Sequence, residues 1–273
     1  MRFEEFARLH GVIVGPIKPG KWQRFPTEDK PRHKNGAVKH MGTHAYVQNW
    51  ALMEEPAIWW ADGLTQEAKA RLQSVANQAH KESTEAARKA AQKAEWMLSE
   101  CELSQHPYIA SKGFPDEMVN VWRKESDNVA VIPMRAGARI VGAQCISASG
   151  DKKFLYGQRS SGAEFVIGNR GPHVLCEGYA TGLSVRQALH SLKLQAQIHV
   201  TFSSGNMKKI AANLDSGYVV ADNDASGTGE KTASEIGWPY WMSEIQGEDF
   251  NDAHIRMGTF KAGMKLKALL MKK

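Results

Sequence analysis

The stretch GYVVADNDASG at residues 217–227 runs from an apolar segment directly into two acidic residues and then a glycine. A second stretch, HVLCEG at residues 173–178, has the same order of apolar residues, acid and glycine. Short apolar runs of this kind predict strands that are buried on both faces, as in a parallel sheet. Glycine after the acid permits a tight turn. The two stretches therefore predict two buried strands that each end in a carboxylate.

The sequence around these two stretches alternates between strand and helix patterns. The strand patterns are short β-branched runs, and the helix patterns place apolar residues three and four positions apart. In chain order they are HVLCEG (strand), TGLSVRQALHSL (helix), QIHVTF (strand), NMKKIAANL (helix), GYVVAD (strand) and TGEKTASEIG (helix). This alternation predicts an α/β domain over residues 171–273, with a Rossmann-like parallel sheet and right-handed crossovers.

The chain before this domain divides into three segments. Residues 1–62 hold short apolar pieces broken by Gly, Pro and charge, which predicts a small loop-rich module. Residues 63–105 include a long run without Gly or Pro, from Leu64 to Leu103, with Ala at helical spacing. This run predicts one long amphipathic helix that connects the flanking parts, or, as the alternative, grips DNA. Residues 106–170 predict antiparallel strands, so the whole chain is expected to be α+β.

Acidic residues at the ends of parallel strands are expected to meet at one edge of the sheet, where the ligand sites of such sheets lie. Crowded carboxylates repel one another unless a cation neutralises them, and Mg²⁺ prefers oxygen ligands. We therefore predict a Mg²⁺ or Mn²⁺ site that serves phosphoryl chemistry. Its expected ligands are Glu177, Asp222 and Asp224, with Asp249 and Asp252 from the later loop GEDFNDAH.

Each acid also has a purely structural interpretation. Asp222 is placed to cap the helix that begins near Thr228, Asp249 to cap the helix FNDAHIRM, and Glu177 to be a solvated strand end. For any single acid this alternative is at least as good as a metal site. Their shared position at strand ends favours the metal site for the group.

The two acidic stretches together resemble the motif of the TOPRIM domain, which bacterial-type primases, type IA and type II topoisomerases and some nucleases share. Glu177-Gly178 matches its first part and Asp222-Asn-Asp224-Ala-Ser-Gly227 its second. HPYIASKGF resembles the entry segment of phage and plasmid primases, IPMRAGARIVGAQCIS their hairpin, and GEDFNDAH their last acidic loop. The resemblance covers residues 106–256 and, more faintly, the N-terminal module.

This resemblance implies a TOPRIM-domain DNA primase of phage or plasmid type, with Glu177, Asp222 and Asp224 as catalytic residues and metal ligands. Thr181 departs from the pattern, because many primases carry a further acid there. The N-terminal segment resembles a primase zinc ribbon in position but lacks its cysteines. The histidines at 10, 33, 40 and 44 match no ribbon spacing, so zinc is not expected.

Basic residues before the acidic domain are candidates for binding nucleotide and primer–template. The resemblance places the basic subdomain of primases here, with Lys153 and Arg159 as first choices, and a solvated hairpin face is the alternative. The candidates are Arg135, Arg139, Lys152, Lys153 and Arg159.

Cations and aromatic residues mix in the N-terminal module, a composition suited to single-stranded DNA. The candidate template-binding residues are Lys21, Trp22, Arg24 and Lys34. The alternative is that Trp22 and Phe25 form a small core with charged loops outside.

The bulk composition agrees with a nucleic-acid partner without requiring one. The net charge is +6, and the three cysteines are far apart, which is typical of a reducing cytoplasm. No segment predicts a secretory signal or membrane span, so no membrane partner is expected.

The sequence thus predicts a cytoplasmic primase that makes short RNA primers on single-stranded DNA from nucleoside triphosphates, with a replicative helicase as a further candidate partner. A TOPRIM metal-dependent nuclease and a catalytically weakened nucleic-acid-binding replication protein are the alternatives. A topoisomerase is disfavoured, because the chain is short for a tyrosine-bearing domain and gate.

Overall fold

The computed structural model describes residues 1–32, 34–50, 52–53, 56–61, 66–123 and 127–272. The chain divides into two compact units, Met1–Glu85 and Ala86–Lys273. The expected boundary near residue 62, and His33, lie outside the described residues. Among the described helices, none is long and apolar enough to cross a membrane.

The first unit pairs a short helix with an antiparallel sheet. Its elements are α1 (Phe3–Leu9), β1 (Gln23–Phe25), β2 (Gly36–His40), β3 (His44–Asn49) and β4 (Ala57–Trp60), with strand order β1-β2-β3-β4. The buried core contains Phe3, Phe25, Val38 and Val47. The sequence indicated loops here because the strands are short and Gly and Pro separate them.

Helix α2 (Gln66–Ser99) contributes residues to both units, since the division falls at residue 85. In the second unit Ala90, Ala94 and Met97 are buried against Val131 and Ala143 of a sheet. The helix was expected to continue to Leu103. It ends at Ser99, because Glu102–Ser104 forms the strand β5 and pairs with the next strand instead.

An antiparallel sheet opens the second unit, as expected for residues 106–170. Its strands are β5 (Glu102–Ser104), β6 (Val119–Arg123), β7 (Asn128–Ala136), β8 (Arg139–Ile146) and β9 (Lys152–Phe154), in that spatial order, and α3 (Pro107–Ser111) lies between β5 and β6 in the chain. Alternate residues of β7 face opposite ways: Val131 packs with α2, whereas Ile132 packs with the core of the second sheet.

The second sheet of this unit is mostly parallel and has strand order β10-β12-β11-β13-β14. Only β10 among these strands runs antiparallel, against β12. The strands are β10 (Phe165–Ile167), β11 (His173–Cys176), β12 (Gln197–Val200), β13 (Tyr218–Ala221) and β14 (Tyr240–Met242). The helices are α4 (Tyr179–Ser191), α5 (Ser204–Ala211), α6 (Thr228–Ile236), α7 (Phe250–Met257) and α8 (Thr259–Leu270).

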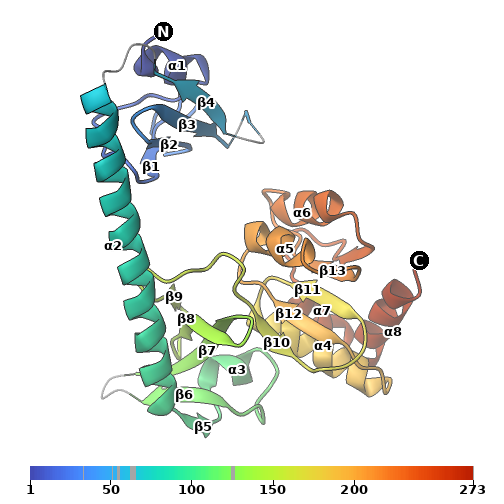
Figure 1. The fold of residues 1–273 in the computed structure, drawn as a ribbon. Helices are drawn as coiled ribbons and strands as arrows, with labels where there is room; N and C mark the ends of the chain where they lie inside the picture. The colour runs from blue at the N-terminus through green and yellow to red at the C-terminus, as the bar shows by residue number, and fades with distance from the viewer. Residues whose placement is uncertain (33, 51, 54–55, 62–65, 124–126, 273) are drawn as a thin grey trace. The chain divides into compact units, whose positions relative to one another are not determined.

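Helices cover both faces of this sheet (Figure 1). Val174 and Val220 face the side of α4 and α8, and Leu175 and Val219 face the side of α5 and α6. The chain moves from β11 to one neighbour, β12, and then crosses to the other neighbour, β13. The crevice between β11 and β13 is therefore the topological switch point, where open α/β sheets bind ligands.

These sheets confirm the expected fold class: antiparallel sheets precede a mostly parallel sheet with interleaved helices.

Candidate metal site at the switch point

Glu177 and Asp222 follow the two strands that flank the switch point. Cys176 pairs with Val220 in the parallel register, so Glu177 lies level with Ala221, one residue before Asp222. The Ser204 hydroxyl, at the start of α5, donates to Glu177 Oε2 at 2.7 Å. The structure thus brings the two acids together and fixes the orientation of one of them.

Asp222 is the most perturbed carboxylate of this group. Its Oδ1 is buried and has no hydrogen-bond partner in the protein. Burial above all, and then the charges of Asp249, Glu177 and Asp224, raise the pKa of Asp222 to about 7. Four carboxylates therefore share one electrostatic environment, which we call the acidic site (Glu177, Asp222, Asp224 and Asp249).

Asp224 is exposed and held by a local turn. Its Oδ1 accepts hydrogen bonds from the Ser226 amide at 2.9 Å, the Ser226 hydroxyl at 2.5 Å and the Thr228 amide at 3.3 Å. These bonds, that of the Ser226 hydroxyl above all, lower the pKa of Asp224. Asp224 thus stays ionised beside Asp222, and it, rather than Asp222, bonds to the first amide of α6.

Asn223 ties the strand end of β13 to the loop that carries Asp249. Its side-chain amide donates to the Ser243 carbonyl at 2.8 Å, and its own carbonyl accepts from the Gly247 amide at 2.5 Å. Asp249 also caps α7, since its Oδ1 accepts from the Asp252 amide at 2.8 Å. Asp249 therefore caps α7, as the structural interpretation predicted, and its charge also acts on Asp222 in the acidic site.

Asp252 is not among the charges that raise the pKa of Asp222. Its Oδ1 lies 3.5 Å from Lys112 Nζ. The neighbouring acid Glu248 is buried and pairs with Arg256 through two hydrogen bonds of 2.6 and 2.9 Å. Two acids of the GEDFNDAH loop are therefore in ion pairs, and Asp249 is the acid of this loop whose charge raises the pKa of Asp222.

The acidic site fits a hard divalent cation. Among the described residues, no group of three or more His, Cys, Asp or Glu side chains is placed to hold a metal ion by itself. Mg²⁺ does not need a complete protein cage, because it binds through one or two carboxylates and keeps several waters. The buried Oδ1 of Asp222, which has no hydrogen-bond partner, is available as a ligand. The neighbouring carboxylates add negative charge that favours a cation. Asp222, Glu177 and Asp224 are the residues that would hold the ion.

Lys152 is the expected basic residue whose charge acts on the acidic site. Its charge lowers the pKa of Asp222, and its Nζ lies 5.6 Å from the centre of the Tyr108 ring. Lys152 pairs with Ile146 and Lys153 with Cys145. Cross-strand partners share a face, so Lys152 is on the side of Ile146 and the parallel sheet, whereas Lys153 is on the side of α2.

The three expected arginines are exposed on the hairpin and the following loop. Arg135 donates to the Ala138 carbonyl at 3.1 Å, and Arg159 donates to the Ser161 carbonyl at 3.2 Å. Lys209 of α5, which the sequence did not single out, reaches the Ser161 hydroxyl at 2.8 Å. Arg139 begins β8.

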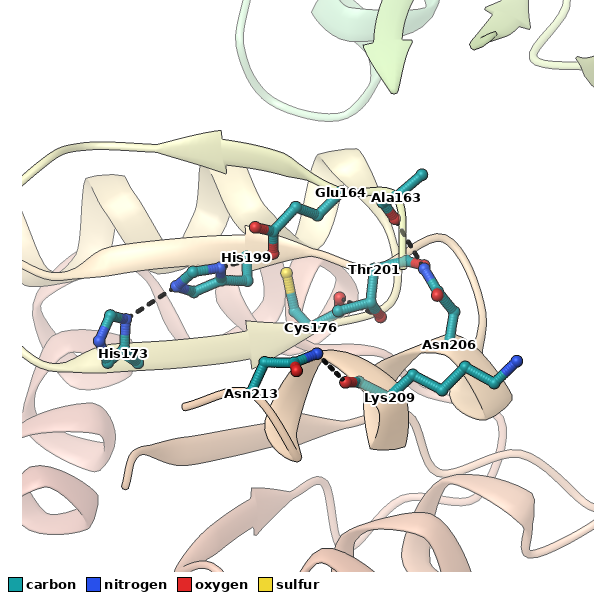
Figure 2. A network of polar contacts seen from close by, with 9 residues as sticks. All are labelled: Ala163, Glu164, His173, Cys176, His199, Thr201, Asn206, Lys209 and Asn213. Carbon is teal, nitrogen blue, oxygen red and sulfur yellow. Dashed lines mark hydrogen bonds and ion pairs between the residues drawn. The ribbon is translucent and has the colours of Figure 1, made fainter. Parts of the chain in front are cut away.

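Asn206 anchors the loop that follows Arg159 (Figure 2). Its side-chain nitrogen donates to the carbonyls of Ala163 and Thr201, both at 2.7 Å, and its Oδ1 accepts from the Gly162 amide at 2.7 Å. Beside it His199 bonds Glu164 at 2.7 Å and His173 at 2.9 Å. This buried polar network holds β10 and its preceding loop against β12. Distant in sequence, its members gave no recognisable pattern.

The first unit exposes several aromatic rings near its expected template-binding residues. Trp22 is 49% exposed and Phe25 is in the core, so only Phe25 fits the alternative in which both are buried. Arg24 stacks over Trp50 at 3.8 Å, and Lys21 pairs with Glu82 at 3.1 Å, while Lys34 is exposed.

Three further rings of this unit lie close to one another. The His44 ring centre lies 5.0 Å from that of Trp60 and 5.3 Å from that of Tyr46. The Tyr46 ring centre lies 6.2 Å from that of Trp22. We call Trp22, His44, Tyr46 and Trp60 the aromatic cluster. Of these, the sequence predicted a role in template binding for Trp22 alone, because strand pairing brings the others to it.

The raised pKa of Asp222 makes the stability of the metal-free protein depend on pH. Because the folded state favours the protonated carboxyl, this contribution is complete below about pH 4 and is lost as the pH rises through about 7. We compare the free energy of unfolding of Asp222→Asn with that of the parent at two pH values. The variant should gain about 2 kcal/mol relative to the parent between about pH 4 and about pH 8, and at about pH 8 it should be the more stable protein. Urea unfolding in a chelator measures this difference; a gap that does not change with pH would contradict it.

Comparison with known proteins finds similarity only at the level of structure. No family model matches the chain. No curated protein matches it either. A matching solved structure is that of the bacteriophage T7 lagging-strand DNA polymerase interacting with primase domains of two gp4 subunits bound to an RNA/DNA hybrid and dTTP. The match has 18% sequence identity and a TM-score of 0.42, and covers 56% of this chain and 81% of that chain. The parallel sheet, with acids at the ends of β11 and β13, is consistent with the TOPRIM fold expected from the sequence.

Proposed function

We propose that this protein is a template-directed nucleotidyltransferase of the primase type, which makes short RNA primers on single-stranded DNA in the cytoplasm. The observation that supports it most is the acidic site itself. Adjacent parallel strands end in Glu177 and Asp222 at the switch point, and Asp222 carries a buried oxygen that no protein group satisfies. A hard divalent cation together with substrate phosphates completes such a site.

The residues of the acidic site divide the work of phosphoryl transfer. Asp222, Glu177 and Asp224 would hold a divalent ion, which would supply Lewis acidity and balance phosphate charge. Asp222 and Asp224 offer one partly buried and one exposed carboxylate on the same loop. Glu177, which Ser204 orients, lies across the crevice and positions the attacking hydroxyl. Asn223 keeps Asp249 beside them through its contacts with Ser243 and Gly247.

Lys152 is the basic residue that we assign to the nucleotide phosphates, in preference to Lys153. Phe154 lies two residues after Lys152 on the same face of β9. Its ring centre is 6.3 Å from that of Phe202, which follows β12, so this face of β9 is directed toward the parallel sheet. Arg135, Arg139 and Arg159 are then available to more distant parts of the primer–template. Each such cation adds a salt-dependent contact with phosphate.

We expect Lys152→Ala to raise the KM for nucleoside triphosphates about tenfold, because a charge-assisted contact with phosphate is lost. Lys153→Ala is the matched control, since it removes the same charge one residue away on the opposite face of β9. Steady-state incorporation by both variants measures the effect. Equal KM values for the two variants would contradict the assignment of Lys152.

The first unit is assigned to the template. The aromatic cluster offers ring faces for stacking bases, and Lys21, Arg24 and Lys34 supply cations in the same unit. Stacking of this kind is worth about 1–3 kcal/mol per base and tolerates different sequences. Zinc has no assigned role here, in keeping with the absence of cysteine from residues 1–62.

Labelled nucleotides, single-stranded DNA of varied sequence and Mg²⁺ or Mn²⁺ test the proposal. We expect incorporation that depends on both template and metal. Cutting of the DNA without incorporation would instead identify a nuclease, which uses the same acids. DNA binding without either reaction would identify a replication protein without catalysis. A replicative helicase added to the same assay tests whether it stimulates priming.

A further inference from the structure

The free edge of the parallel sheet lies beside an apolar groove with positive charge on its wall. Strand β14 pairs only with β13 among the described strands, so its other side is open. A groove of about 990 Å³ runs along it, between β14 and the C-terminal helix α8. We propose that this groove binds an extended acidic segment of another protein, which pairs with β14 as an added strand.

The backbone of β14 offers hydrogen-bonding groups to such a segment. The Val219 amide donates to the Pro239 carbonyl, and Val220 pairs with Trp241. In a parallel ladder, alternate residues turn their N–H and C=O groups to the neighbouring strand. Pro239 and Trp241 therefore face β13, and Tyr240 and Met242 direct their backbone groups into the groove. An added strand is the ligand that matches these groups.

The side chains of the groove define what the segment carries. Ala268 is exposed on the helix wall, beside the buried Leu269, and the partly buried Trp241 lines the groove from β14. Lys265 of α8 and Lys272, which follows the end of that helix at Leu270, both line the groove. Alternate residues of an added strand face the same way, so side chains that meet this wall are separated by an even number of positions. The matching pattern is an acidic residue, an apolar residue two positions later and a second acidic residue two positions after that.

The charge of the groove indicates whether the bound segment is acidic or basic. Glu244 is the acid that also lines the groove. The groove thus presents two lysines and one acid to the occupant, which favours an acidic segment over a basic one. Docking there is separate from nucleotide transfer, because no carboxylate of the acidic site lines the groove, although Asn223 does.

Fluorescence anisotropy with the capped, labelled peptide TETVTET tests this site on the full chain. We expect it to bind at least about tenfold more tightly than TKTVTKT. The two glutamates of the first peptide form ion pairs with Lys265 and Lys272, whereas the two lysines of the second are repelled by them. The double reversal Lys265→Glu with Lys272→Glu should invert that preference. Lys261→Glu with Lys267→Glu is the matched control, because these exposed lysines of α8 do not line the groove; it should leave the preference unchanged.

Amide hydrogen exchange separates strand addition from contact through side chains alone. Saturating TETVTET should slow exchange of the Tyr240 and Met242 amides at least about tenfold. The proposal is overturned by unchanged exchange at both amides, by equal affinity for the two peptides, or by equal loss in both double variants. Displacement of the peptide by single-stranded DNA would assign the lysines to nucleic acid and overturn it as well.

Discussion

Replacing Asp222 by Asn is expected to lower primer synthesis by at least about a thousandfold while DNA binding persists. The side chain keeps its size and loses the charge that a divalent ion requires. Its buried Oδ1 has no protein partner to compensate for that loss. Steady-state and single-turnover incorporation at saturating Mg²⁺ would measure the effect.

Asp215→Asn is the matched control for this experiment. Asp215 is an exposed acid in the loop before β13, at the other end of that strand from Asp222, so its replacement changes the net charge equally. Incorporation by this variant should stay within about twofold of the parent. Comparable losses in both variants would mean that overall charge, and not the acidic site, limits the reaction.

The second large effect is expected from Gly229→Ala, at the start of α6. A Cβ at Gly229 would lie 2.1 Å from the backbone carbonyl oxygen of Asp222, much closer than atoms can approach. Either α6 or the strand end must move, at a cost of about 2 kcal/mol in folding free energy. Because the strand end carries Asp222, we also expect about a hundredfold loss of incorporation.

Gly205→Ala gives the comparison for Gly229→Ala. Gly205 is also in the first turn of a helix, α5, but a Cβ there meets no atom within 4 Å. Alanine should therefore stabilise the protein by about 0.5–1 kcal/mol through helix propensity. Urea unfolding of both variants measures the difference. A Gly229→Ala protein as stable as the parent would show that the close approach to Asp222 is not required.

The parallel domain could be predicted because local pattern and tertiary role agree there. The apolar runs of β11 and β13 are buried on both faces, and each ends where an acid begins. Parallel strands bring equivalent ends together, so the neighbourhood of Glu177 and Asp222 followed from their positions in the sequence.

Other features depend on contacts between distant residues and left no local signal. The sequence ranked Lys153 above Lys152, because the strand register that distinguishes them requires knowledge of the pairing between β8 and β9. Asp252 resembled a ligand by its position in an acidic loop, but its ion pair with Lys112 depends on a residue 140 positions earlier. The first unit resembled loops because its strands are short and its core is small.

Direct titration of Mn²⁺ into the metal-free protein tests the central claim, that the acidic site binds a divalent cation. Electron paramagnetic resonance of free Mn²⁺ reports binding without any assay of activity. We expect saturable binding to the parent and to Asp215→Asn, and at least about tenfold weaker binding to Asp222→Asn. The same affinity in all three proteins would contradict the claim.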